Sequence, residues 1–176
     1  MVHPPQGNVK LNATQGSLLG FLHAGPRTGW ELLQEAKAGL ARFWNVTPSH
    51  VYRELAALER RRLVRAGTPG PRDRRPFTIT AAGRRAFAGW IEETPGPEQI
   101  RFPLLVSLWF GKHLPAATLT SFVEAARKEH EARLVLYEGL QTDDPHVGAV
   151  VSFGVHYERA VLEWLGSVSF GEDASA

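Results

Sequence analysis

One predicted helix, residues 47–63, carries side chains that suit DNA binding. It begins with a threonine that can cap the first turn and a proline at the first helical position. Val51, Leu55 and Leu58 recur at the spacing of one buried face. The rest of the helix offers side chains that hydrogen-bond to base edges and phosphates in a groove. These residues are Thr47, Ser49, His50, Tyr52, Arg53 and Arg60. Taken alone, the segment fits an ordinary amphipathic surface helix equally well.

The charge of the chain is divided between its two halves. Residues 42–85 hold eleven arginines against three acidic residues, a net charge of +8, although the whole chain carries only +2. Residues 95–176 hold six basic and eleven acidic residues, a net charge of −5. A basic block beside an acidic one indicates a polyanion-binding module joined to a module with another task. The alternative is a solvated run of charge with no partner.

Three arginines fall in a predicted loop between two short strands. Residues 63–66 and 76–80 alternate as strands do, and the residues between them are rich in glycine and proline. The guanidinium group suits phosphate because its planar fork donates two parallel hydrogen bonds and stays charged. The sequence therefore predicts a β-wing that contacts the DNA backbone through Arg72, Arg74 and Arg75.

Further helices must hold these groups in place. One is predicted to start at Thr14, and a second starts near Thr28 and ends before residues 43–45. Together with the helix over 47–63 they make the three-helix core of a helix-turn-helix. Thr80 caps a fourth helix over 81–94, which the proline-rich segment that follows must break.

The second half is predicted to form three helices, over 98–113, 115–141 and 146–165. The first is apolar almost all round and should be covered on most sides. Three such helices bury their apolar surface more easily against a second copy, so a dimerisation domain is expected. The interface residues expected from the last helix are Val150, Val151, Val161, Trp164 and Leu165.

These patterns predict a mainly α fold with a small β-wing, in which a winged helix-turn-helix precedes a three-helix dimerisation domain. The expected divisions are a flexible tail over 1–12, a DNA-binding domain over 13–94, a dimerisation domain over 95–166 and a loose tail over 167–176.

Other classes of protein find little support in the 176 residues. The N-terminus lacks the apolar core of a signal peptide, and the longest apolar run is far shorter than the ~20 residues of a membrane span. There is no cysteine, which fits a cytoplasmic protein. No nucleophile elbow, phosphate loop or dinucleotide fingerprint occurs, so neither an enzyme nor a cofactor is expected.

The seven histidines do not form a metal-binding motif. No two of them stand four residues apart on one predicted helix, so no metal site is expected. His130 lies on the apolar stripe of its helix and is predicted to be a core histidine with a hydrogen-bond partner. Four aromatic residues are candidates for an effector pocket, although such residues more often belong to the core or a dimer interface: Trp90, Phe102, Trp109 and Tyr157.

From residue 18 to residue 90, the sequence motifs resemble those of the PadR family of bacterial transcriptional regulators. The matching segments are LLGFL at 18–22, GWEL at 29–32, TPSHVY at 47–52 and TITAAGR at 78–84, and LWFGKHLP at 108–115 looks like a signature of the family's helical C-terminal domain. The resemblance implies a homodimeric repressor that binds an inverted-repeat operator in double-stranded DNA and is released by a small, often aromatic, molecule.

Three departures from the family pattern matter. Ser49-His50 stands where Gly-Ser or Gly-Thr is common, Arg53 stands where proline often is, and Arg62 replaces a frequent turn glycine. The first two change the groove-facing chemistry, so the operator sequence cannot be taken from relatives. Two other functions stay open at this point: a small-molecule-binding protein and an architectural DNA binder without sequence preference.

Overall fold

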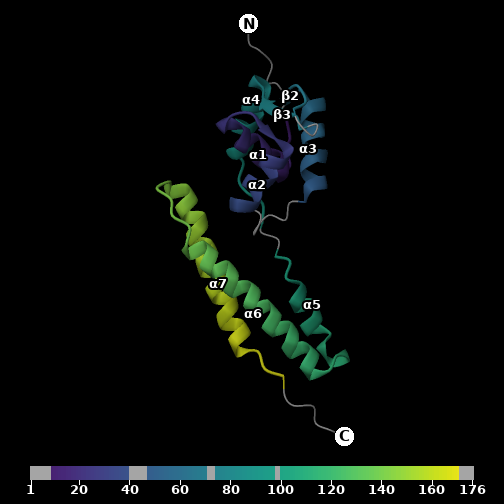
Figure 1. The fold of residues 1–176 in the computed structure, drawn as a ribbon, viewed down its shortest axis with the longest axis vertical. Helices are drawn as coiled ribbons and strands as arrows, with labels where there is room; N and C mark the ends of the chain where they lie inside the picture. The colour runs from purple at the N-terminus through teal and green to yellow at the C-terminus, as the bar shows by residue number, and fades with distance from the viewer. Residues whose placement is uncertain (1–8, 40–46, 71–73, 98–99, 171–176) are drawn as a thin grey trace. The chain divides into compact units, whose positions relative to one another are not determined.

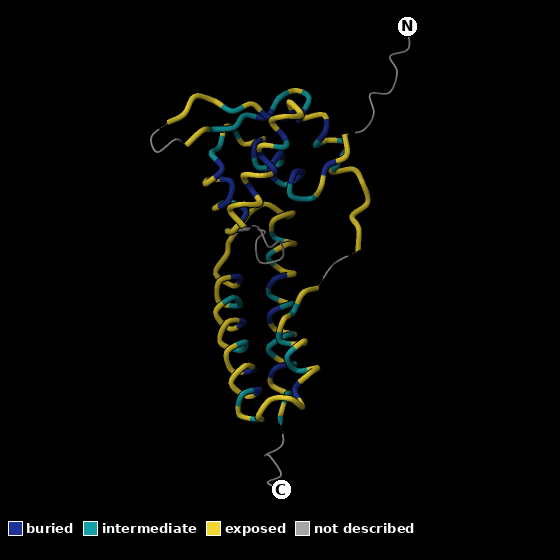
Figure 2. Tube along the Cα trace, turned by 90° about the vertical axis from the view of Figure 1, so that its right-hand side faces the viewer, coloured by how far each residue is buried: buried dark blue, intermediate teal, exposed yellow. Residues whose placement is uncertain are grey.

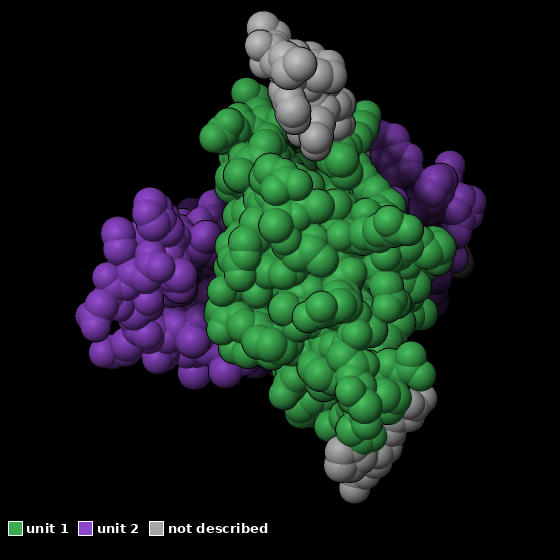
Figure 3. Space-filling model, turned by 90° about the horizontal axis from the view of Figure 1, so that it is seen from above, with its two compact units in different colours: residues 1–97 green, residues 98–176 purple. Residues whose placement is uncertain are grey.

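The computed structural model describes residues 9–39, 47–70, 74–97 and 100–170. The chain divides into two compact units, residues 1–97 and residues 98–176, shown in different colours in Figure 3.

Unit 1 is a helix-turn-helix with a small sheet (Figure 1). Its elements are α1 (Ala13–Phe21), η1 (Leu22–Ala24), β1 (Arg27–Thr28), α2 (Gly29–Gly39), α3 (Pro48–Arg60), β2 (Val64–Ala66), β3 (Pro76–Ile79) and α4 (Ala81–Ile91). The sheet is antiparallel with the order β1-β3-β2, and Arg27 pairs with Phe77 while Val64 pairs with Ile79. The predicted winged helix-turn-helix is confirmed, but the two-residue strand β1 was not predicted.

The core of unit 1 brings together all three helices of the helix-turn-helix and the wing. Val51, Leu55 and Leu58 are fully buried, as the spacing in α3 predicts. Around them lie Leu18, Leu19, Leu22, Leu32, Leu33, Leu63, Val64 and Ile79. Because burial of one such side chain contributes about 1.5–3 kcal/mol, this cluster is what fixes α3 on the rest of the unit. Buried positions of the described residues are dark blue in Figure 2.

The flexible tail predicted over residues 1–12 extends too far, because residues 11 and 12 are part of unit 1. Leu11 is buried in the core of unit 1, and Asn12 rather than Thr14 caps α1. The Asn12 side chain accepts a hydrogen bond from the Gln15 backbone N–H at 2.8 Å, and the Gln15 side chain accepts one from the Asn12 N–H at 3.4 Å. The pair forms a capping box, so residues 11 and 12 belong to the folded unit.

The end of α3 explains the unusual Arg62. Its φ of 57° is left-handed, the conformation that favours glycine. The Arg62 N–H donates to the Glu59 carbonyl at 2.8 Å and the Leu63 N–H donates to the Leu58 carbonyl at 2.9 Å, which is the Schellman pattern. This tight turn ends α3 before residue 63, and β2 starts at Val64, one residue later than predicted.

Unit 2 is a long helical hairpin with a short helix beside it. Its elements are α5 (Pro103–Trp109), η3 (Gly111–His113), α6 (Ala116–Glu138) and α7 (Pro145–Ser167). Contacts pair Tyr137 with Gly154, His130 with Glu158 and Arg127 with Leu165, so α6 and α7 run antiparallel. Figure 2 shows their buried positions on facing sides. None of the described helices is long and apolar enough to cross a membrane.

The prediction of one helix over residues 98–113 is wrong. The helix begins only at Pro103, because proline is suited to the first helical position, and a 3₁₀ turn follows it. Its apolar side chains are exposed in the single chain, among them Leu105, Val106, Trp109 and Phe110, with Trp109 83% exposed, so the expected cover stays a prediction.

A polar pair lies inside the hairpin. His130 Nδ1 and a Glu158 carboxylate oxygen are hydrogen-bonded, and the two residues are only 4% and 2% exposed. The Phe102 ring packs in edge geometry with both His130 and Trp164, with ring centroids 5.6 Å and 5.7 Å apart. The predicted role of His130 as a partnered core histidine is confirmed.

Candidate DNA-binding surface

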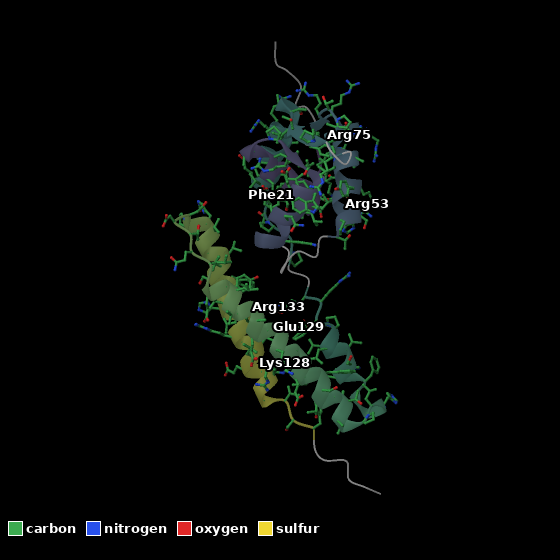
Figure 4. All side chains as sticks on the ribbon, in the orientation of Figure 1. Phe21, Arg53, Arg75, Lys128, Glu129 and Arg133 are labelled. Atoms are coloured by element: carbon green, nitrogen blue, oxygen red, sulfur yellow. The ribbon has the colours of Figure 1, made fainter. Side chains whose placement is uncertain are left out.

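The first turn of α3 is capped on the side that faces solvent. The Thr47 hydroxyl accepts a hydrogen bond from the His50 N–H at 3.3 Å and lies 3.1 Å from the Ser49 hydroxyl. Thr47, Ser49, His50, Tyr52, Arg53 and Arg60 are all exposed, opposite the buried stripe of the helix. The six residues are therefore solvent-accessible, as the proposed role requires, and Figure 4 labels Arg53 on α3. Their contacts with DNA stay a prediction.

Tyr52 leans from α3 onto the first residue of α2. A Cβ atom on Gly29 would lie 2.5 Å from Tyr52 Cε1, so the ring occupies the space that any other residue at position 29 would fill. The matching segment GWEL begins with this glycine, which gives it a packing role. The Tyr52 side chain remains half exposed beside the polar face of α3.

Arg53 is held by its neighbour Glu54. Arg53 Nε and Nη2 lie 3.2 Å and 3.1 Å from the same oxygen, Glu54 Oε1. Burial by itself would raise the pKa of Glu54, but hydrogen bonds from Asn12, Gln15 and Arg53 outweigh it and hold that pKa below its usual value. Glu54 is therefore an ionised carboxylate at neutral pH. No role for Glu54 was predicted, because its donors Asn12 and Gln15 lie about 40 residues away in the chain.

The wing carries Arg74 and Arg75 directly before β3. Two backbone hydrogen bonds join the two sides of the wing. The Gly67 N–H donates to the Pro76 carbonyl at 2.7 Å, and the Gly70 N–H donates to the Arg74 carbonyl at 2.9 Å. The Arg74 guanidinium carbon lies 5.0 Å from the centroid of the Trp30 ring in α2, a cation–π contact that the sequence did not predict. Both arginines are exposed, and Figure 4 labels Arg75. The third predicted arginine, Arg72, lies outside the described residues.

The four predicted effector residues have different neighbours. Trp90 belongs to unit 1, where its indole covers Gly16 beside Phe87. In unit 2, Phe102 packs on His130 and Trp164, and the Tyr157 ring stacks on Phe153 with 6.1 Å between centroids. Trp109 is largely exposed. A shared effector pocket stays a prediction.

One predicted interface residue is unavailable to a second chain. Leu165 is fully buried between α6 and α7, and its carbonyl accepts a hydrogen bond from Arg127, so that assignment is wrong. Val150 is exposed, while Val151, Val161 and Trp164 are half-buried. Exposed apolar residues that the sequence analysis did not single out lie near the connection between α6 and α7: Val135, Leu136, Leu140, Val147 and Phe153.

The fold and this surface define a class of protein. A helix-turn-helix with an exposed polar face on α3, an arginine-bearing wing and a helical second unit is the architecture of a winged helix-turn-helix transcriptional regulator. Residues 18–89 match the model of the PadR-like transcriptional regulator family, and residues 100–169 match that of the virulence activator alpha C-terminal domain. The winged helix-turn-helix of unit 1 is therefore a PadR-like domain.

Relatives cover nearly the whole chain. A probable transcriptional regulator of Mycobacterium tuberculosis is 26% identical over 166 residues, covering 81% of this chain and 88% of the relative. The negative transcriptional regulator PadR of Bacillus subtilis is 22% identical over 170 residues, covering 86% and 93%.

Solved structures share the fold. Bacillus subtilis PadR in complex with operator DNA has a TM-score of 0.69 at 21% identity, and the match covers 89% of this chain and 96% of that one. The same regulator with p-coumaric acid has a TM-score of 0.65 at 20% identity, with the same coverage. A PadR-like regulator from Bacillus cereus has a TM-score of 0.74 at 16% identity, covering 87% and 93%.

Proposed function

We propose that this protein is a homodimeric cytoplasmic repressor that binds an inverted-repeat operator and is released by a small aromatic ligand. The observation that carries the proposal is the exposed polar face of α3 beside the wing. A recognition helix reads base edges with side chains near its N-terminus, where Ser49, His50 and Arg53 lie. Bacillus subtilis PadR is a negative transcriptional regulator with a solved operator complex, which supports the repressor role. The protein then has no catalytic task.

The recognition helix and the wing are expected to contribute differently. Arg53→Ala should weaken operator binding by about 1–3 kcal/mol and random duplex little, because a base contact is lost. Replacing Arg74 and Arg75 together should weaken both duplexes and lower the slope of log affinity against log salt by up to about 2, because each arginine neutralises one phosphate. The measurement is a set of isotherms for each variant at several salt concentrations, on DNA upstream of the gene and on random duplex.

The same isotherms separate the alternatives. Specific sites usually exceed random DNA in affinity by about 10³ or more. An unmodified protein whose two affinities are equal would be an architectural DNA binder, and one that binds neither duplex would be a small-molecule-binding protein. If Arg53→Ala weakens both duplexes equally, Arg53 contacts phosphate, and specificity must come from Ser49, His50 or DNA shape.

The exposed apolar side chains of unit 2 support the homodimer. Valine, leucine and phenylalanine side chains gather at the α6–α7 connection, and further ones lie on α5. Large apolar side chains left exposed in such numbers favour an interaction site. An inverted-repeat operator requires a two-fold protein, so a second copy of the chain is the occupant that the proposed function needs.

We expect the full chain to sediment at twice its 19.4 kDa at micromolar concentration. The double variant Val150→Glu/Phe153→Glu should shift it towards the monomer, because two carboxylates would be desolvated in the interface. Ser152→Glu adds the same kind of charge at an exposed polar position of the same helix and is the matched control. A monomeric unmodified chain contradicts the proposal.

The ligand is supported by the p-coumaric acid complex of Bacillus subtilis PadR and by the aromatic residues of the chain. A ligand releases DNA only if it binds the DNA-free arrangement more tightly. Titration with p-coumaric acid should therefore quench tryptophan fluorescence and weaken operator binding together. Quenching with unchanged operator affinity would contradict a switch. The candidate residues remain Trp90, Phe102, Trp109 and Tyr157.

A further inference from the structure

Glu54 is a buried carboxylate on the helix proposed to enter the DNA groove. Glu54 as a whole residue is 9% exposed. The side chain of its neighbour Arg53 is 64% exposed. A carboxylate buried without donors would be strongly unfavourable, so its hydrogen bonds must compensate. They come from three side chains: Asn12 Nδ2 at 3.2 Å, Gln15 Nε2 at 2.8 Å, and Arg53 Nε and Nη2 at 3.2 Å and 3.1 Å.

The two carboxylate oxygens divide these donors. Oε2 accepts hydrogen bonds from the side-chain amides of Asn12 and Gln15, and Oε1 accepts two from the single guanidinium group of Arg53. The amides are themselves fixed, because Asn12 caps α1 and the Gln15 side-chain oxygen accepts a hydrogen bond from Arg61 at 2.9 Å. Arg61 also donates to the Lys10 carbonyl at 2.9 Å. Glu54 is therefore a rigid link between α1 and Arg53.

This link decides which part of Arg53 is free. A guanidinium has five N–H groups in one plane, and Glu54 occupies the side formed by Nε and Nη2. The other edge of the fork, formed by Nη1 and the remaining N–H of Nη2, has two parallel donors. We propose that Glu54 positions Arg53 so that this edge donates to O6 and N7 of one guanine in each operator half-site. The inference rests on the proposed function of sequence-specific DNA binding.

Charge and geometry favour guanine over the other acceptors in DNA. In the major groove guanine offers two adjacent acceptors, whereas adenine pairs one acceptor with a donor. A phosphate also offers two acceptors, but the Arg53–Glu54 pair is neutral as a whole and so has little long-range attraction for the backbone. The free edge of Arg53 can still donate two directional hydrogen bonds to a base. Glu54 therefore acts as a positioning residue, whose effect on DNA passes through Arg53.

The test begins with sites selected from a random-sequence duplex pool by the full chain. Each guanine of the selected half-site is then replaced by 7-deazaguanine, which lacks the N7 acceptor. For the unmodified protein we expect one position where this lowers affinity about tenfold, because the bidentate contact is reduced to a single hydrogen bond to O6. Glu54→Gln should reduce that penalty to about twofold, because an amide cannot accept on both sides as the carboxylate does.

A cycle of variants separates positioning from a merely structural role. In an Arg53→Ala background, Glu54→Gln should change the 7-deazaguanine penalty no further, since its effect passes through the missing arginine. Glu59→Gln removes an exposed carboxylate from the same helix and should leave the penalty at tenfold. Glu54→Asp keeps the charge but withdraws the oxygens by one methylene, and should give an intermediate penalty even if Glu54→Gln folds poorly.

Three results would overturn the inference. In the first, both Glu54 variants keep the tenfold 7-deazaguanine penalty, melt at a lower temperature and bind all duplexes more weakly by the same factor. Glu54 would then have only a structural role. Specific binding without any guanine sensitive to N7 removal would show that Arg53 does not contact guanine in this way. A pool that yields no enriched sequence would remove the proposed function itself, and that failure is distinct from the other two.

Discussion

Gly83→Ala is expected to lower the free energy of unfolding of residues 1–97 by about 3–5 kcal/mol, a large share of the 5–15 kcal/mol that holds a domain folded. The added Cβ would lie 2.1 Å from the carbonyl oxygen of Leu63 and 2.9 Å from Ile79 Cγ1. A backbone oxygen cannot rotate away as a side chain can. The first turn of α4 would have to move, with the hydrogen bonds that fix it.

Those hydrogen bonds join α4 to the wing. The Leu63 carbonyl accepts the Thr80 N–H at 3.0 Å, and the Thr80 hydroxyl caps Gly83 at 3.0 Å while lying within 3.0 Å of the carbonyls of Arg62 and Leu63. Each hydrogen bond contributes about 1 kcal/mol, and losing a partner for a buried group costs more. The expected loss therefore combines overpacking with a broken cap.

Urea unfolding followed by circular dichroism measures the effect, and a helical glycine provides the control. Gly148 lies near the start of α7, and a Cβ there would meet only Thr142 Cγ2 at 3.9 Å. Gly148→Ala should stabilise the protein by up to about 1 kcal/mol, because alanine favours the helix. If the two substitutions change stability equally, the close contact between position 83 and the Leu63 carbonyl does not determine the effect of Gly83→Ala.

Glu158→Ala is expected to destabilise unit 2 by about 3–5 kcal/mol, because removing one partner of a buried pair leaves the other without its hydrogen bond. His130 lies at 4% exposure beneath Phe102, so water cannot readily replace the lost carboxylate. The removed side chain also leaves a cavity between α6 and α7. Chemical denaturation at one fixed protein concentration is the measurement, since the stability of a dimer depends on concentration.

The double variant His130→Leu/Glu158→Met tests whether the pair or the packing matters. Apolar residues of similar volume often replace a buried ion pair without loss, so most of the stability should return. A double variant as unstable as Glu158→Ala would mean that the His130–Glu158 hydrogen bond is required for the hairpin itself.

The fold was predictable wherever short stretches of sequence carry its signals. Thr47 and Pro48 set the start of α3, and glycine and proline mark the wing, because caps and turns depend on adjacent residues. Strand β1 has only two residues, too few for a periodic pattern, and its pairing with β3 spans 50 positions. The left-handed Arg62 broke the expectation of glycine at such a turn.

The candidate site divides in the same way. The exposed face of α3 follows from helical spacing, so the polar residues were placed correctly. The burial of Glu54 depends on Asn12 and Gln15, which reach it from another helix, and no local pattern announces that contact. Trp109 shows the converse, since apolar composition predicted cover that unit 2 alone does not provide.

The sheet order β1-β3-β2 has a consequence for synthesis on the ribosome. β3 lies in the middle although it is the last strand made, so neither β1 nor β2 has a partner until Ile79 has left the exit tunnel. The nascent chain should then fold unit 1 as one step while residues 98–176 are still being translated, over several seconds at ~5–20 residues per second. Proteolysis of stalled nascent chains should show protection beginning only after that strand emerges.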